Sequence, residues 1–294
     1  RCRPRARHLR CHIGQEEFAG LLPQILDDMD QPSIDGINTW LVSRAARQAG
    51  LKVALSGLGG DELLGGYPSF RDIPRWVGAM GLASRIPGLG VLVRRAMGFV
   101  PAARRTPKLA GMLEYGGSYP GAYLLRRGIY LPFELDRVLD PVIVRDGLRR
   151  LRLLDRFTEE MSPDPGLPTL RVSALESAVY MRNQLLRDAD WAGMAHGVEI
   201  RTPLVDWKLL RDVAGCLPAL AGAGKSALAS APSKPLKGEV VDRPKTGFLI
   251  PTKRWLAQEA AMTGVVRTQG AVSRRWAIEV FGRVGTGADC AVAA

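Results

Sequence analysis

Two adjacent carboxylates follow a glycine-rich turn in the first quarter of the chain. The turn is Ser56-Gly57-Leu58-Gly59-Gly60, and Asp61 and Glu62 come directly after it. The glycines let the backbone turn tightly and approach a ligand that side chains would keep away. Carboxylates repel phosphate, so beside such a turn they fit best as ligands of Mg²⁺, which takes one or two carboxylates with phosphate oxygens and water. The turn predicts a nucleotide and metal site, against the plainer alternative of an ordinary strand-to-helix connection.

The elements around this turn favour an α/β arrangement. The run Val53-Ala54-Leu55 shows no polar alternation, which is typical of a strand covered on both faces in a parallel sheet. Upstream, we expect a helix over residues 40–46, with Ser33 or Asp35 as its N-terminal cap and Gly50 in the left-handed conformation beyond its end. The turn then lies at the carboxyl end of a strand, where open α/β sheets bind their ligands.

Further motifs lie before and after the glycine turn along the chain. Together with the glycine turn, they resemble the synthetase domain of the asparagine synthase family of glutamine-dependent amidotransferases, from about Asp30 to Leu256. The matching strings are Asp30-Gln31-Pro32-Ser33, Arg187-Asp188-Ala189-Asp190, Glu199-Ile200-Arg201-Thr202-Pro203-Leu204-Val205-Asp206 and Arg243-Pro244-Lys245-Thr246-Gly247-Phe248.

The resemblance implies a fold and an activity. The implied fold is α/β, with a partial parallel sheet of the adenine-nucleotide alpha-hydrolase (pyrophosphate-loop ATPase) type and a predominantly helical remainder. The implied reaction is the ATP-dependent amidation of a small carboxylate through an acyl-adenylate, with release of AMP and pyrophosphate. ATP and Mg²⁺ are the implied cofactors, ammonia comes from a glutaminase domain, and a homodimer is one assembly consistent with the resemblance.

The resemblance also implies roles for the turn and for two later residues. In the turn, Ser56, Gly57, Gly59 and Gly60 contact the nucleotide, Asp61 helps to hold Mg²⁺ and pyrophosphate, and Glu62 supports Asp61. Elsewhere, Asp190 orients substrate or metal, and Lys245 neutralises the leaving pyrophosphate.

The two later residues also have plainer interpretations. A capping box, Ser173-Ala174-Leu175-Glu176, predicts the start of a helix that carries Asp188 and Asp190 at its C-terminal end. Charge patterning alone also fits a solvated helix end with Arg187 as the partner of these carboxylates. Lys245, without the resemblance, fits an ordinary surface lysine equally well.

Three features depart from the family pattern. No Ser-Gly-Gly-x-Asp-Ser pyrophosphate loop occurs in the sequence, and Cys2 follows Arg1, so it is no N-terminal nucleophile of a glutaminase. We therefore expect a fragment that lacks both the loop and the glutaminase domain. Leu58 occupies the position of a glutamate in aspartate-specific members, so the acceptor is aspartate or another acid. The alternative function is a catalytically inactive nucleotide-binding or scaffold fragment.

Composition excludes several other classes of protein. The net charge is +12, but the basic residues are scattered without interleaved aromatic residues, so we expect no specific nucleic-acid partner. The cysteines show no paired spacing of a zinc site or a disulfide framework. No apolar run approaches the roughly 18 residues of a membrane span, so we expect no membrane partner and a cytoplasmic protein.

The motifs suggest one main domain. We expect residues 1–265 to form an N-terminally incomplete synthetase domain and residues 266–294 to form a poorly defined C-terminal tail. Between the motifs, residues 75–110 are rich in glycine, proline and arginine, and we expect short helices there that are broken by Pro87, Pro101 and Pro107.

Overall fold

The computed structural model describes residues 9–100, 106–220, 225–236, 238–242, 255 and 269–284. These residues form two compact units, and each unit is assembled from separate stretches of the chain. Unit 1 contains the described residues of Arg1–Ser56, Leu185–Arg201 and Thr246–Cys290. Unit 2 contains the described residues of Gly57–Gln184 and Thr202–Lys245.

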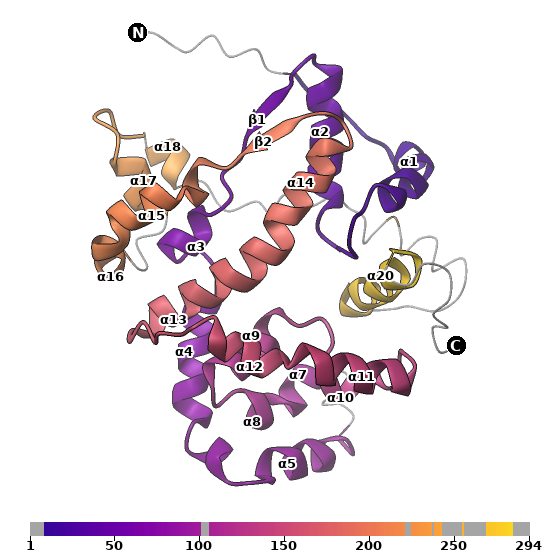
Figure 1. The fold of residues 1–294 in the computed structure, drawn as a ribbon, viewed down its shortest axis with the longest axis vertical. Helices are drawn as coiled ribbons and strands as arrows, with labels where there is room; N and C mark the ends of the chain where they lie inside the picture. Colours follow the sequence, from indigo (N-terminus) through magenta and orange to yellow (C-terminus); the bar gives the residue numbers. More distant parts are fainter. Residues whose placement is uncertain are drawn as a thin grey trace. The chain divides into compact units, whose positions relative to one another are not determined.

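Unit 1 is a helical layer beside a small parallel sheet (Figure 1). Strands β1 and β2 pair in parallel, with Ala54 opposite Ile200. Its core contains the large side chains of Phe18, Trp40 and Trp191. The elements of unit 1 are α1 (Gln15–Asp27), α2 (Ile37–Gln48), β1 (Val53–Leu55), α14 (Leu186–Met194), β2 (Glu199–Arg201) and α20 (Gln269–Val284).

The parallel pairing is as predicted, but the burial of the strand is not. The expectation that both faces of β1 are covered is wrong, because the Leu55 side chain is 77% exposed and Val53 is 40% exposed. Within the described residues each strand has only one neighbour, so the sheet is too narrow to bury an apolar run on both sides. The structure thus contains a two-stranded piece of the partial parallel sheet that the sequence predicts.

Two glycines, one near the end of α14 and one after it, allow the close passage from α14 to β2. Gly197 has a φ of 62°, a left-handed conformation that favours glycine. A Cβ on Gly193 would lie only 2.6 Å from the carbonyl oxygen of Val198, which is the residue just before β2. The amide of Val198 donates to the carbonyl oxygen of Gly193 at 3.0 Å, so the chain reverses closely enough to bring β2 beside β1.

The ends of α2 confirm one prediction and correct another. Gly50 has a φ of 78°, as expected for the left-handed residue beyond the helix. Neither Ser33 nor Asp35 is the cap, because α2 starts at Ile37 with Gly36 in that position. The Ser33 hydroxyl instead accepts hydrogen bonds from the amides of Asp35 and Gly36 and closes the turn ahead of the helix.

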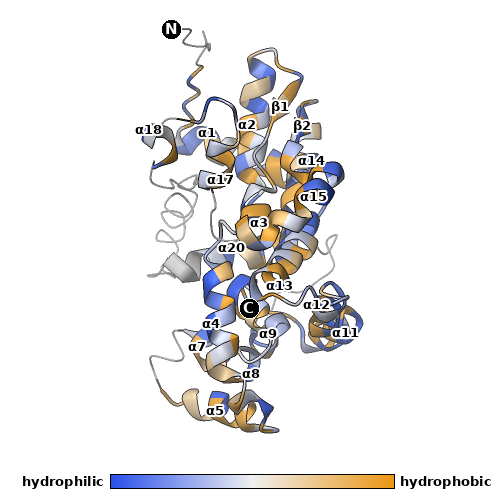
Figure 2. Ribbon diagram, turned by 90° about the vertical axis from the view of Figure 1, so that its left-hand side faces the viewer, coloured by the Kyte–Doolittle hydropathy of each residue, from blue (hydrophilic) through white to orange (hydrophobic). Residues whose placement is uncertain are grey.

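Unit 2 is almost entirely helical. Figure 2 colours much of α3 and α13 as hydrophobic, in agreement with the burial of Leu64, Val172 and Leu175. Its elements are α3 (Gly60–Leu64), α4 (Ser69–Met80), η1 (Ala83–Arg85), α5 (Leu89–Met97), α7 (Pro107–Ala110), α8 (Met112–Tyr115), α9 (Tyr119–Arg127), α10 (Pro132–Leu135), α11 (Pro141–Leu151), α12 (Leu153–Glu159), α13 (Pro168–Leu175), η2 (Glu176–Leu185, whose last residue belongs to unit 1), η3 (Pro203–Val205), α15 (Trp207–Val213), η4 (Ala214–Cys216), α16 (Leu217–Leu220), α17 (Lys225–Ser230) and α18 (Gly238–Val241).

The proline-rich region has the short helices that its sequence predicts. Elements α5 and α7 each span fewer than ten residues, and Pro107 opens α7 at the first helical position. Pro74 lies inside α4 without ending it. Pro101 lies outside the described residues. None of the helices that the structure describes is long and apolar enough to cross a membrane.

The predicted capping box is wrong. Helix α13 begins at Pro168, so Ser173 lies inside the helix, and Glu176 opens the π-helical element η2. A capping glutamate lies in the exposed first turn of a helix, whereas the Glu176 side chain is completely buried. Proline at the first helical position and the burial of Glu176 together override the local capping signal.

Part of the expected C-terminal tail is a packed helix. Residues 269–284 form α20, and its side chains Trp276 and Val280 lie in the core of unit 1 beside α1. The domain boundary near residue 265 stays a prediction. The part of the chain beyond it nevertheless contributes apolar surface to the core of unit 1.

The packing of α20 leads to a prediction for two tryptophans. Trp276 is 7% exposed and Trp207, in α15, is 71% exposed. We expect Trp276→Ala to lower the free energy of unfolding by about 3 to 5 kcal/mol, because it opens a cavity in a packed core. The matched control Trp207→Ala should change it by about 0.5 kcal/mol or less. Urea unfolding followed by circular dichroism measures both, and equal losses would show that α20 does not stabilise unit 1.

Candidate functional site

The glycine turn leaves β1 and enters α3, as its sequence predicts. The amide of Ser56 donates to the carbonyl oxygen of Arg201 at 2.8 Å and extends the pairing of β1 with β2 by one residue. The amide of Gly60 donates to the carbonyl oxygen of Gly57 at 3.3 Å, and Gly59 is left-handed with a φ of 90°. The strand, turn and short helix therefore follow one another in the order typical of a nucleotide-binding loop.

The glycines of the turn serve different purposes. A Cβ on Gly59 would lie 2.8 Å from the Val205 side chain and 2.9 Å from the carbonyl oxygen of Leu204. Gly59 therefore lets the turn approach η3 of its own chain, and Gly60 meets Leu204 in the same way at 3.0 Å. A Cβ on Gly57 would meet nothing within 4 Å, and Gly57 is exposed. Gly57 therefore borders open space, unlike Gly59 and Gly60.

The two carboxylates of the turn have different environments. Asp61 is half-buried, whereas the Glu62 side chain is 2% exposed and accepts a hydrogen bond from the Tyr67 hydroxyl at 2.8 Å. Burial raises the pKa of Glu62, and the bond from Tyr67 partly opposes that rise. Glu62 thus faces the interior of unit 2, and Asp61 is the carboxylate of the pair that could reach a ligand.

The surroundings of Asp61 decide which metal site it could form. Within the ranges that the structure describes, no group of three His, Cys, Asp or Glu side chains could hold a metal ion. One aspartate does not hold Mg²⁺ alone, but Mg²⁺ commonly binds through one or two carboxylates, phosphate oxygens and water. The single carboxylate of Asp61 therefore fits a Mg²⁺ ion that arrives with a nucleotide, and does not fit a permanent metal centre.

Gly66 shapes the position of the Asp61 carboxylate, and we had not assigned it a role from the sequence. A Cβ on Gly66 would lie 1.9 Å from Oδ1 of Asp61 and 2.7 Å from its Cγ. The amide of Gly66 also donates to the backbone carbonyl oxygen of Asp61 at 2.8 Å. Before it, Gly65 ends α3 in the left-handed conformation. The sequence signal for this contact was the glycine pair that follows α3.

In unit 1, the upstream motif that ends at Ser33 meets the Arg187-Asp188-Ala189-Asp190 motif around Asp188. This residue is 2% exposed, and it accepts hydrogen bonds from the Ser33 hydroxyl at 2.8 Å and from the Trp191 indole at 3.0 Å. A Cβ on Gly36 would lie 2.3 Å from the Trp191 ring, so the turn after Ser33 also packs closely here. Burial raises the pKa of Asp188 to about 6, and nearby carboxylates, including that of Asp35, act in the same direction.

Asp190 and Arg187 lie differently from Asp188. Asp190 is exposed, because residues two apart on a helix point in different directions. Arg187 forms an ion pair with Asp30 of the upstream motif. The alternative of a solvated helix end with Arg187 as partner therefore does not hold for the buried Asp188, whereas the exposure of Asp190 agrees with a solvated helix end. Lys245 lies outside the described residues.

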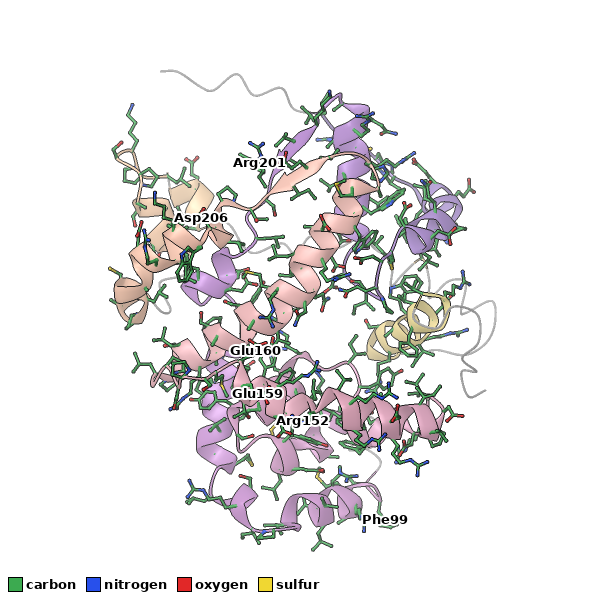
Figure 3. All side chains as sticks on the ribbon, viewed as in Figure 1. Phe99, Arg152, Glu159, Glu160, Arg201 and Asp206 are labelled. Carbon is green, nitrogen blue, oxygen red and sulfur yellow. The ribbon has the colours of Figure 1, made fainter. Side chains whose placement is uncertain are left out.

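The third motif supplies an exposed ion pair and a helix cap, and Figure 3 labels a residue of each. Arg201 donates to Glu199 at 3.0 Å along β2, and the hydrogen bond from Arg201 lowers the pKa of Glu199. Asp206 caps α15 by accepting from the amide of Leu209 at 2.9 Å. The structure therefore brings together Gly57, Gly59, Gly60, Asp61 and Glu62 in unit 2, and contains Ser56 and Asp190 in unit 1.

Comparison with known proteins gives one consistent family. The model for asparagine synthase matches residues 3–276. A putative asparagine synthetase (glutamine-hydrolyzing) of Mycobacterium tuberculosis strain H37Rv is 30% identical over 263 residues, which are 85% of this chain and 38% of the relative. Asparagine synthetase (glutamine-hydrolyzing) 1 of Bacillus subtilis strain 168 is 28% identical over 265 residues, with 84% and 38% covered. The chain spans about 38% of the length of these relatives, and no solved structure gives a significant match.

The contact between Gly66 and Asp61 predicts a coupled pair of substitutions. We expect Gly66→Ala to cost about 1 to 3 kcal/mol of stability, because its methyl group displaces the Asp61 carboxylate. In an Asp61→Ala background the same substitution should cost at least about 1 kcal/mol less, since the colliding atoms are gone. Gly78→Ala, in α4 with nothing within 4 Å of the added Cβ, is the control and should stabilise by up to about 1 kcal/mol. Urea unfolding measures the cycle, and additive costs would contradict the contact.

The raised pKa of Asp188 predicts a dependence of stability on pH. An aspartate whose pKa is about 6 in the folded state and about 3.9 when unfolded binds its proton more tightly in the folded state. Its favourable contribution is present below pH 4 and is lost as the pH rises through 6. The free energy of unfolding of the wild type, measured relative to that of Asp188→Asn, should therefore fall by about 3 kcal/mol at most between pH 4 and pH 7. Urea unfolding at several pH values measures this difference, and a constant difference would refute it.

Proposed function

The chain belongs to the asparagine synthase family, and from that premise we propose that it forms the ATP-dependent part of a ligase that amidates a carboxylic acid. The carboxylate of the acid is first activated as an acyl-adenylate. One carboxylate oxygen bonds to the α-phosphorus of ATP, and pyrophosphate leaves. Ammonia then attacks the acyl carbon, and AMP leaves. The observation that carries the proposal is the strand and glycine turn that lead into α3, with the half-buried Asp61 in the first turn of that helix.

Each residue of the turn has a proposed role. Ser56 and Gly57 contact the nucleotide, because Gly57 leaves the space beside it open. Gly59 and Gly60 let the turn pack against η3. They contact the nucleotide through the backbone of the turn. Asp61 binds Mg²⁺ together with the nucleotide, and Glu62 holds the turn from the interior of unit 2. Bound Mg²⁺ would neutralise charge on the phosphates as pyrophosphate leaves.

Two residues outside the turn complete the proposal. Lys245 places its positive charge near the leaving pyrophosphate. A charge fixed at that position stabilises the negative charge that develops in the transition state. Asp190, exposed on α14, orients the acceptor or the metal. Support for both comes from their places in the family motifs. Ammonia comes from glutamine or from solution, and the protein acts in the cytoplasm.

The specificity for the acceptor acid depends on the position that Leu58 occupies. Leu58 is half-buried in the turn, and its alkyl side chain cannot supply the negative charge of a glutamate. We propose aspartate or another small carboxylic acid as the acceptor, which the assay distinguishes.

Exchange of labelled pyrophosphate into ATP tests the proposed reaction. The assay uses this chain and the longest polypeptide in which the sequence occurs, with each of a panel of carboxylic acids that includes aspartate. Exchange that requires one acid supports adenylation and identifies the acceptor. Binding of ATP without exchange, in both samples and with every acid, would support the alternative of a catalytically inactive nucleotide-binding segment.

Replacing the metal-binding carboxylate gives a sharper prediction. Asp61→Asn keeps the shape of the side chain but removes its charge, so exchange at limiting Mg²⁺ should fall by about 10²-fold or more. Asp146→Asn, the same change on α11 where Asp146 pairs with arginine neighbours, is the matched control and should retain the wild-type rate. Equal rates for Asp61→Asn and wild type would remove Asp61 from the metal site.

A further inference from the structure

A buried ionic cluster lies beside the candidate site in unit 2. The Glu176 carboxylate is 0% exposed, and Arg127 pairs with it at 2.7 Å. The Ser69 hydroxyl donates to the same carboxylate at 2.5 Å, and the Tyr123 hydroxyl at 3.4 Å. Elements α4, α9 and η2 thus converge on one carboxylate, which the proposed reaction does not use.

Arg127 connects this cluster to the aromatic side chain that follows α3. Its guanidinium lies 4.5 Å from the ring centre of Tyr67 and 3.7 Å from that of Tyr180. A guanidinium can stack on aromatic faces while it donates to a carboxylate in its own plane, which the compact ammonium of lysine cannot do. Arg127 therefore fixes the Tyr67 ring and pairs with Glu176 at the same time.

Tyr67 carries the connection to the carboxylate pair. Its hydroxyl donates to Glu62 at 2.8 Å, and burial raises the pKa of Tyr67, so the hydroxyl stays protonated and remains the donor. A second bond reaches the same residue from α13, where the Ser173 hydroxyl donates to the backbone carbonyl oxygen of Glu62 at 2.9 Å. Helix α3 has only five residues, too few to hold its own conformation without such contacts.

The ionic character of the cluster argues for orientation rather than for stability. Buried ion pairs are costly to desolvate, and apolar side chains of similar size often stabilise a core as well or better. What an apolar cluster would lack is directional bonding that ends on one residue. Here the bonds of the cluster end on Glu176, and Arg127, stacked on Tyr67, connects the cluster to the Tyr67 bond to Glu62, the immediate neighbour of Asp61.

We propose that Arg127 and Glu176 are positioning residues that hold α3, through Tyr67 and Glu62, in the orientation in which Asp61 meets the metal and the nucleotide. This inference rests on the proposed function for the identity of the ligand. Glu62 then has a positioning role and binds no metal itself. Glu62 holds α3 from the interior of unit 2, next to the half-buried Asp61.

Two tyrosine variants test the connection. Tyr67→Phe removes the bond to Glu62 but keeps the ring under Arg127. The matched control Tyr123→Phe removes another hydroxyl of the cluster, which donates to Glu176. Amide hydrogen exchange of α3 measures how often the helix opens, and electron paramagnetic resonance of Mn²⁺ with ATP measures metal and nucleotide affinity. Both variants are compared at equal folded fractions, which urea unfolding determines.

The expected results separate the two variants. Tyr67→Phe should speed exchange in α3 and weaken Mn²⁺ and ATP binding by about three- to tenfold, the usual effect of one hydrogen bond. Tyr123→Phe should leave both within about twofold. Arg127→Lys keeps the charge but loses the stacking, so it should act like Tyr67→Phe, and the double variant should be no worse than Tyr67→Phe alone because the residues act in series.

The outcomes distinguish this inference from the proposed function. Unchanged exchange and affinity in Tyr67→Phe, or equal effects in Tyr67→Phe and Tyr123→Phe, would overturn the positioning role. A wild type that binds no Mn²⁺ with ATP would overturn the proposed function. In that case hydrogen exchange of α3 alone decides whether Arg127 and Tyr67 hold it.

Discussion

The buried carboxylate of Glu176 ties three helical elements of unit 2 to one point. A carboxylate removed from water must be paired and hydrogen-bonded, since an uncompensated charge in the interior is strongly destabilising. Glu176 receives bonds from Ser69 on α4, from Tyr123 and Arg127 on α9, and itself opens η2. These elements have to meet at one point for the charge to be satisfied. Their apolar sides can then pack in the surrounding core.

Unit 1 is organised around a buried carboxylate of another kind. Among the described residues, the groups that bond Asp188 are neutral donors, the Ser33 hydroxyl and the Trp191 indole. The pKa of Asp188 rises to about 6 because hydrogen bonds from neutral groups compensate desolvation only in part. The contact joins two motifs that lie 155 residues apart in the sequence. Each motif therefore includes a residue whose role is to hold the other motif in place.

The local features of the fold could be predicted from the sequence, and the features that depend on tertiary contacts could not. The strand before the turn, its parallel pairing and the left-handed Gly50 follow from short-range rules on apolar runs and glycine. The capping box failed because Ser173 and Glu176 have the right spacing, while Pro168 had already started the helix. The prediction that both faces of β1 are covered was wrong because an apolar run does not reveal how many strands flank it. Helix α20 was missed because Trp276 has its packing partners far away in the sequence.

The same distinction explains how much of the candidate site the sequence could predict. A motif identifies the positions that matter, but it does not say which way each side chain faces. Asp61 and Glu62 are neighbours on a short helix, so their side chains point in different directions and cannot serve one metal equally. Gly57 and Gly59 differ in the same way, because one leaves open space and the other lets the turn approach η3. Glu62 and Gly59 are held by contacts with residues outside the turn, namely Tyr67 for Glu62 and Leu204 and Val205 for Gly59. A string that resembles a set of ligands therefore contains, in three dimensions, both residues that border open space and residues that pack against their own chain.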